Sequence, residues 1–232
     1  MTTKHLLLGL LVVAACQGSD SKPAAASKEP APATTPVPEP VPPPALTAPD
    51  SAALAAHAPN KYTVVFLTSK GEVEIEVERA LAPLGADRFH YLVANGFFPG
   101  TRFFRVVRGF VAQFGLSGRP AVDAAFDPLT FKDDPRKISN AKGTLVFAKT
   151  DRPDTRSTQM FINLVDNGPL LDAQGFAPFG KVTRGMDVVE ILFSTYGEMI
   201  TQQQGLIATR GNKWLMERYP ELDSIVSATI KP

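Results

Sequence analysis

The chain has few of the residues on which most catalytic sites depend. Its 232 residues include one cysteine, Cys16, and three widely separated histidines, His5, His57 and His90. One cysteine excludes an intrachain disulfide, and no metal-ligand spacing such as H-x-x-x-H occurs. The chain also lacks G-x-S-x-G, P-loop and G-x-G-x-x-G motifs. Enzymes that need a covalent nucleophile, a metal or a nucleotide are therefore unsupported.

Charge of one sign is lacking as well. The 24 Lys and Arg residues nearly balance the 23 Asp and Glu residues, which leaves a formal net charge of +1. A protein that grips nucleic acid mainly by charge would be far more basic, so we expect no nucleic-acid partner. The apolar content of 44% is ample for a packed core. The length allows one medium domain plus an appendage.

The N-terminus has an apolar run that is too short to cross a membrane. Lys4 precedes ten apolar or small residues, Leu6 to Ala15, whereas a spanning helix needs about 20 residues. A positive charge followed by a short apolar run is typical of a secretory signal peptide. We therefore predict a signal peptide over residues 1–15.

The end of this run resembles the lipobox of bacterial lipoproteins. It reads Val13-Ala14-Ala15-Cys16, and the resemblance implies cleavage before Cys16 and lipidation of its thiol. Gln17, rather than Asp, follows the cysteine, which by the sorting rule of some bacteria implies the outer membrane. We expect a lipid-anchored protein of the bacterial cell envelope. The alternative is an ordinary signal peptide with an incidental cysteine.

Residues 16–60 are rich in proline and alanine. Eleven of the 21 prolines lie between Pro23 and Pro59. Such a segment has little apolar surface to bury, so we predict a disordered, semi-extended tether. The folded domain should then occupy residues 61–232.

Short apolar runs separated by turn signals predict a domain that is mainly β. In 72–78, three apolar residues alternate with four glutamates, which predicts a strand with a solvated glutamate face. Apolar residues at helical spacing predict a helix over 82–96, closed by Asn95-Gly96. The other expected strands are 62–68, two within 103–115, 144–148, 159–165, 177–182 and 225–230, and shorter helices are expected over 185–193 and 212–218.

The stretch 103–115 reads F-F-R-V-V-R-G-F-V-A-Q-F-G and predicts two strands that bend at Gly109. Period-2 geometry places Arg105 on the face opposite Phe104, and Gln113 on the same face as Val111. Polar groups on stiff strands among apolar residues can form a shallow, partly dry site. The alternative is that Arg105 is a solvated residue of an outer sheet face.

Three segments resemble the cyclophilin-type peptidyl-prolyl isomerases. The first is 103–115, which is similar to the family pattern F-H-R-V-I-x-G-F-M-x-Q-G-G. The second, Gly143 to Asn167, contains S-T-Q-M-F-I-N, and the third, Leu171 to Met186, contains L-D and F-G-K-V-T-R-G-M. The matches come in the family's order and cover roughly residues 61 to 232.

The resemblance implies a closed eight-stranded antiparallel barrel capped by two helices, no cofactor, and proline-containing polypeptides as partners. We expect a monomer. It further implies that Arg105 stabilises the twisted amide and that Gln113 orients the arginine and binds substrate backbone. The implied substrate-binding residues are Phe110, Val111, Ala148, Lys149 (through its backbone), Gln159, Phe161, Leu170, Leu171 and Phe176.

Several positions depart from the family pattern. Phe104 replaces the histidine before the arginine, Val111 replaces a methionine, and Leu170 stands where cyclosporin-sensitive members have tryptophan. These departures bear on substrate preference and drug sensitivity more than on catalysis. The predicted function is isomerisation of X-Pro bonds in cell-envelope proteins, which assists their folding. A tethered proline-peptide binding or holdase module without significant catalysis is the alternative.

Overall fold

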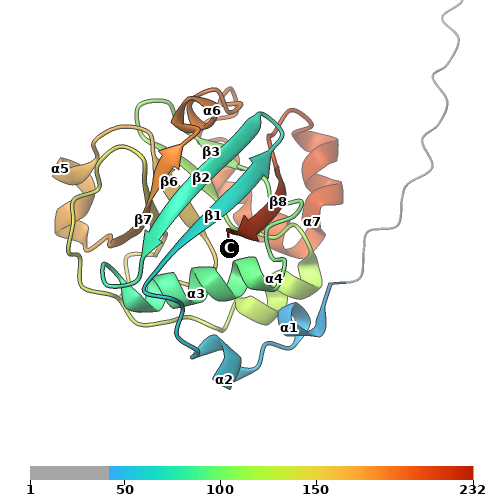
Figure 1. Ribbon diagram of the computed structural model, residues 1–232. Helices are drawn as coiled ribbons and strands as arrows, with labels where there is room; N and C mark the ends of the chain where they lie inside the picture. The colour runs from blue at the N-terminus through green and yellow to red at the C-terminus, as the bar shows by residue number, and fades with distance from the viewer. Residues whose placement is uncertain (1–41, 232) are drawn as a thin grey trace, which may run out of the picture. The chain divides into compact units, whose positions relative to one another are not determined.

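The computed structural model describes residues 42–231. Eight antiparallel strands form one sheet in the order β3-β4-β6-β5-β7-β2-β1-β8, which curls around a single main core (Figure 1). The strands are β1 Lys61–Thr68, β2 Gly71–Glu78, β3 Arg105–Val106, β4 Val111–Phe114, β5 Thr144–Phe147, β6 Met160–Asn163, β7 Pro178–Arg184 and β8 Ile225–Ile230.

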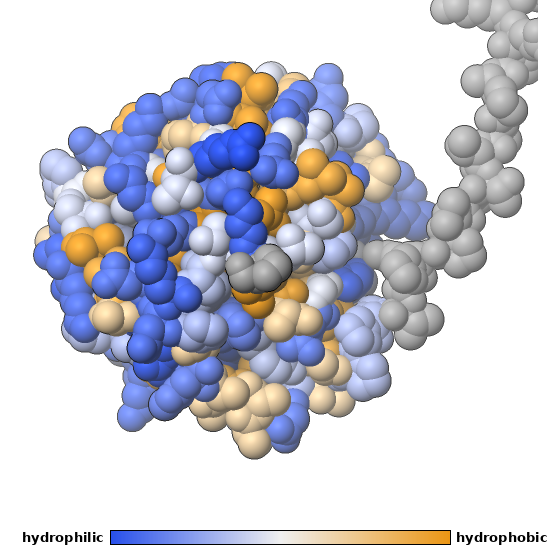
Figure 2. All heavy atoms as spheres, in the orientation of Figure 1, coloured by the Kyte–Doolittle hydropathy of each residue, from blue (hydrophilic) through white to orange (hydrophobic). Residues whose placement is uncertain are grey.

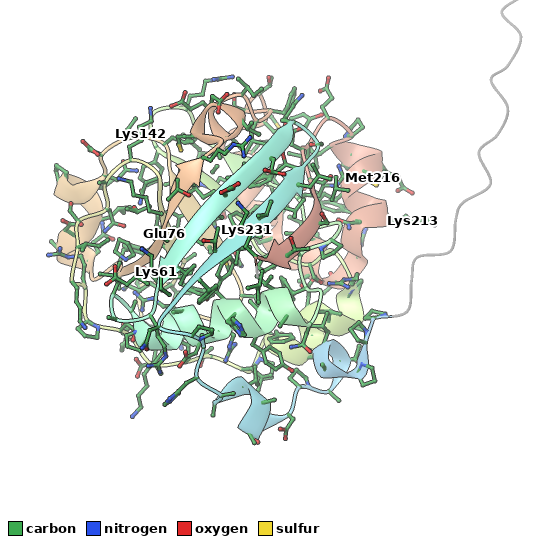
Figure 3. The ribbon with its side chains drawn as sticks, viewed as in Figure 1. Lys61, Glu76, Lys142, Lys213, Met216 and Lys231 are labelled. Atoms are coloured by element: carbon green, nitrogen blue, oxygen red, sulfur yellow. The ribbon has the colours of Figure 1, made fainter. Side chains whose placement is uncertain are left out.

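The β1–β2 hairpin shows why the alternating pattern was informative. Its strands pair over their full length, from Lys61 opposite Glu78 to Thr68 opposite Gly71. Lys61 bonds Glu76 across the strands at 3.0 Å (Figure 3). The intervening apolar residues are buried, so the predicted charged outer face is confirmed. Hydrophilic residues cover much of the face of the molecule shown in Figure 2.

The sheet curls into a half-barrel, and the expected full closure is not found. β3 and β8 are the two ends of the strand order and share no ladder. The segment before β3 meets the start of β8 and the residues before it, through an Arg102–Ser224 bridge and backbone bonds such as that from Gly100 N to Ile225 O at 2.8 Å. β3 has only two residues, so it is too short to continue this pairing.

The helices are more varied than the expected pair of caps. The longest are α3 Pro83–Ala94, which contacts β7 and β8, and α7 Gln204–Arg218, which packs against α4 Pro120–Phe126. α7 begins eight residues before the predicted helix and is kinked at Gly211, where φ is 68°. The shorter helices are α1 Pro44–Thr47, α2 Ser51–Leu54, α5 Gly168–Leu171 and α6 Met186–Glu190, with 3₁₀ turns η1 Asp172–Gln174 and η2 Thr201–Gln203.

α4 lies in a stretch that the sequence indicated as loop. Pro120 occupies the first turn, where its missing N–H costs nothing. Val122 and Phe126, four residues apart, are both buried in the main core. One apolar pair over seven residues is too short a pattern to separate from a loop, and packing rather than propensity stabilises this helix.

Residues 42–60 belong to the packed structure, so part of the predicted tether is ordered. Leu46 in α1 is completely buried in the main core. The Tyr91 hydroxyl donates to Ala45 O at 2.7 Å, and Ala58 N donates to Asp87 at 2.8 Å. The folded unit therefore begins about twenty residues before position 61. The remainder of the predicted tether, the signal peptide and Cys16 lie outside the described residues.

Candidate active site

The site lies on the face of the sheet opposite the main core. Alternate residues of β4 divide between the two faces: Ala112 and Phe114 belong to the main core, whereas Val111 and Gln113 face the other way. Phe161 in β6 faces away in the same manner, between Met160 and Ile162. Period-2 geometry of three neighbouring strands thus collects the site residues on one surface.

Arg105 and Gln113 stand directly opposite each other on β3 and β4. The Arg105 Nη1 donates to Gln113 Oε1 at 3.0 Å, and the Gln113 Nε2 donates to Gln159 Oε1 at 3.0 Å. Gln113 is buried, so both ends of its amide need partners, and both have them. The three side chains form a chain of hydrogen bonds that fixes the guanidinium on one side.

An apolar cluster lies beside this pair, and we call it the aromatic pocket. It consists of buried Val111, Val146, Phe161 and Leu171, with Phe110, Ala148 and Phe176 packed against them. The rings of Phe161 and Phe176 meet edge to face at 5.6 Å between centroids. The Arg105 guanidinium lies over the Phe110 ring at 5.3 Å, an attractive cation–π arrangement.

The two predicted residues at the rim of the pocket, Lys149 and Leu170, differ in how closely they contact it. The Lys149 ammonium lies 5.5 Å from the centroid of the Phe176 ring, so its side chain contributes to the rim as well as its backbone. Leu170 in α5 is 55% exposed and lies outside the buried part of the pocket. The structure thus brings together ten of the eleven predicted site residues within the described chain, and places Leu170 at the periphery.

A cavity of about 900 Å³ adjoins the polar side of the site. Gln113, Ala148 and Gln159 line it on the sheet side, and α4 and the first turns of α7 form the opposite wall. Seven residues between 148 and 159 also line the cavity, so it follows this loop from one end to the other. The helical wall was not predicted, because α4 was expected as loop and only the part of α7 after Gly211, residues 212–218, was expected as a helix.

Sequence reasoning also missed Glu198, an acidic residue in contact with Arg105. Arg105 Nε donates to Glu198 Oε2 at 2.7 Å, and Nη2 donates to Oε1 at 2.6 Å. Hydrogen bonds from Arg105 hold the pKa of the Glu198 carboxyl below its usual value. The two residues are 93 positions apart. No spacing or motif in the sequence connects them.

Neither a metal centre nor a spanning helix is found in the part of the chain that the structure describes. Within residues 42–231, no group of three or more His, Cys, Asp or Glu side chains could hold a metal ion. No helix among them is both long and apolar enough to cross a bilayer.

A curled antiparallel sheet with an arginine–glutamine pair beside an aromatic pocket defines a cyclophilin-like protein. The family model described as "Cyclophilin type peptidyl-prolyl cis-trans isomerase/CLD" matches residues 63–208. This match covers more than half of the chain, and the chain belongs to that family.

Relatives and solved structures agree with this assignment. A peptidyl-prolyl cis-trans isomerase of Acinetobacter baylyi is 36% identical over 151 residues, which cover 62% of this chain and 80% of the relative. Peptidyl-prolyl cis-trans isomerase B of Escherichia coli is 33% identical over 134 residues, covering 55% and 81%. A cyclophilin from Cryptosporidium parvum has the same fold, with a TM-score of 0.56, 19% identity and coverage of 74% and 98%.

Proposed function

We propose that this protein isomerises X-Pro peptide bonds in proteins of the bacterial cell envelope and thereby assists their folding. It is a cyclophilin-type peptidyl-prolyl cis-trans isomerase. The observation that carries the catalytic assignment is the geometry of Arg105. Its guanidinium is bound to Gln113 at 3.0 Å and lies over Phe110 at the edge of the aromatic pocket.

The reaction requires no covalent chemistry. Rotation about the peptide bond destroys amide resonance and meets a barrier of roughly 18–20 kcal/mol. In the twisted transition state, the prolyl nitrogen regains a lone pair and becomes a hydrogen-bond acceptor. A guanidinium N–H directed at that nitrogen stabilises the transition state more than the planar ground state, which is the condition for acceleration.

The other residues of the site would hold the substrate while one side of the bond turns. The aromatic pocket suits the apolar proline ring, which would be dry against Phe161 and Phe176. Gln113, Gln159 and the 148–159 loop offer hydrogen-bonding groups along the adjoining cavity for peptide backbone. A structure of the Cryptosporidium parvum cyclophilin was determined in the presence of the dipeptide Ala-Pro, which supports a proline-containing peptide as the ligand proposed here.

Substitution of Arg105 tests the catalytic role. We expect Arg105→Ala to lower kcat/KM by at least about tenfold, since a hydrogen bond to a charged group contributes roughly 1.5–3 kcal/mol. Arg105→Lys should recover little, because lysine lacks the planar fork. Cis-to-trans relaxation of a short X-Pro peptide measures both, and circular dichroism verifies folding. Near-wild-type turnover in folded Arg105→Ala would overturn the catalytic role of Arg105, whereas wild-type protein that binds the peptide without turnover would support the binding-module alternative.

Attachment to the membrane through a lipidated Cys16 is the second part of the proposal. The sequence Val13-Ala14-Ala15-Cys16 supports it. Each buried CH₂ of an acyl chain contributes about 0.8 kcal/mol, so two or more chains would anchor the protein stably. Gln17 supports the outer membrane as the location.

We expect Cys16→Ser to release the protein from the membrane fraction and to abolish incorporation of radiolabelled palmitate. Density-gradient separation of inner and outer membranes, with wild-type protein as the control, tests the location. Wild-type protein that is exported yet found in the soluble fraction would overturn the lipoprotein assignment while leaving the isomerase assignment intact.

A further inference from the structure

Glu198 binds the side edge of the Arg105 guanidinium with both carboxylate oxygens. The donors are Nε, at 2.7 Å, and Nη2, at 2.6 Å. A two-point contact of this kind fixes the plane of the guanidinium as well as its position. Gln113 alone, with a single bond to Nη1, would leave rotation about that bond free.

The contact leaves donors of the arginine available. A guanidinium has five N–H groups. Glu198 accepts from two of them and Gln113 from one. Among the residues that the structure describes, this leaves one N–H on Nη1 and one on Nη2 for a substrate. Glu198 therefore occupies the side edge of the guanidinium without using up its capacity to donate.

Glu198 is itself held in place. The Thr201 hydroxyl donates to Glu198 Oε2 at 2.9 Å, and Thr201 N donates to the Glu198 carbonyl at 3.0 Å. Two residues beyond Glu198, Ile200 is completely buried in a second apolar cluster. That cluster also contains Phe104, the neighbour of Arg105 in the chain. Both partners of the ion pair are thus anchored in the same packed unit.

Stability is a poor explanation for this ion pair. The Glu198 side chain is 55% exposed, and exposed pairs contribute little to folding because water and salt screen them. A pair that contributes little to folding can still contribute to catalysis by reducing the orientations open to the reacting group. Donors that are already aligned need no rearrangement when the amide twists.

We propose that Glu198 is a positioning residue for the isomerase reaction, acting through Arg105. It holds the guanidinium plane so that the remaining Nη1 and Nη2 donors are directed at the substrate. The inference rests on the proposed isomerase function, to which it adds a residue outside the three segments 103–115, 143–167 and 171–186. Glu198 does not contact the reacting bond in this scheme.

Substitutions of Glu198 in the full-length chain, purified in detergent, test the proposal. We expect Glu198→Ala to lower kcat about threefold to tenfold, with KM changed by less than about twofold, because alignment and not binding is lost. Glu198→Gln should retain an intermediate rate, since its amide oxygen accepts one of the two bonds. The matched control is Glu217→Ala, which removes an exposed carboxylate from α7 and should leave kcat unchanged.

Nuclear magnetic resonance supplies a readout that a general loss of stability would not give. The Arg105 Nε–H signal should be protected from solvent exchange in wild type and in Glu217→Ala, and lost in Glu198→Ala. A folded Glu198→Ala protein with unchanged kcat overturns the proposal, and one with raised kcat shows that the carboxylate competes with substrate instead. A wild type without activity above the spontaneous rate overturns the isomerase function itself.

Discussion

Arg105 lies between two clusters that are built in different ways. On one side is the aromatic pocket, whose members come from β4, β5, β6 and the chain around α5. On the other is a helical cluster of Phe104, Leu116, Ile200, Ile207, Trp214, Leu215, Tyr219 and Leu222, with Tyr196 and Ala208 packed against it. The rings of Phe110 and Phe176 in the pocket are partly exposed, whereas the eight core members of the helical cluster are buried.

The contrast between the two clusters shows that the sheet edge at β3 has two neighbours: the proposed binding pocket on one side, and a helical layer that supports Arg105 on the other. β3 ends the sheet, so its free side has no strand to complete it. The residues from 194 to 222 cover this region through α7 and the turns before it, and they carry Glu198 to the guanidinium. In the proposed mechanism, the pocket side determines which substrate binds, and the helical side determines the orientation of the Arg105 guanidinium toward it.

Removal of Phe104 should have the largest effect on stability. This ring is 1% exposed within the helical cluster, and truncation of a buried Phe to Ala costs about 3–5 kcal/mol. Urea unfolding followed by circular dichroism measures the loss. The matched substitution on the other side is Phe110→Ala, whose ring is only half-buried. Phe110→Ala should cost less stability but weaken peptide binding more. The reverse ranking would contradict the proposed division between the two sides.

Asp123 in α4 should make stability depend on pH. The residue is buried beside the cavity, and burial raises the pKa of its carboxyl to about 6. Between about pH 4 and pH 6, the Asp123 carboxyl is ionised in the unfolded chain but still protonated in the folded chain. Stability should therefore fall as pH rises through this window, by at most about 3 kcal/mol, and then level off.

The contribution of Asp123 can be isolated by difference. Asp123→Asn keeps an oxygen that can accept from Ser117 N, which lies 2.7 Å from Oδ1, but it cannot ionise. Unfolding free energies of the two proteins should diverge between pH 4 and 6 if the assignment is right. Parallel pH profiles would show that the carboxyl titrates at the same pH in the folded and unfolded chains.

Leu170 should give the smallest effect. Its side chain is largely exposed on α5, so Leu170→Ala should change the unfolding free energy by less than about 0.5 kcal/mol. We expect kcat/KM for a short peptide to change less than about twofold. The adjacent Leu171→Ala, at a buried pocket position, should lower stability by about 2–5 kcal/mol. If Leu170→Ala lowered kcat/KM by much more than twofold, Leu170 would belong to the substrate-binding site.

The strands of the pocket side could be predicted from local patterns, whereas the residues that form its walls were implied by the resemblance to the family. Strand alternation in 103–115 predicted the faces of Arg105 and Gln113, and the structure adds that the two residues stand directly opposite each other. Even the boundary of β8, Ile225–Ile230, agrees with its sequence pattern. Period-2 patterns over four to eight residues carry enough apolar contrast for this.

Apart from the helix over 212–218, the helical side could not be predicted, and the reason is physical. The kink at Gly211 divides the apolar spacing of α7, so no continuous helical stripe appears in the sequence. Gly211 approaches Gly118 closely, and Asn212 N donates to Gly118 O at 2.8 Å. The Arg105–Glu198 pair likewise depends on tertiary packing between distant segments. Contacts of this range leave no mark in a single sequence.

The docking of residues 42–58 on the domain has a mechanical consequence for a protein held at its N-terminus. Tension on the chain ahead of residue 42 would first reach the buried Leu46 and the Ala45–Tyr91 hydrogen bond. The tension would next reach the hydrogen bond from Ala58 N to Asp87. Arg79 Nε also donates to the Asp87 carboxylate, at 2.7 Å. Both hydrogen bonds end on residues of α3, Tyr91 and Asp87. A pulling force on the N-terminal segment would therefore act first on α3. β1 and the strands that carry the proposed site would bear less of this load.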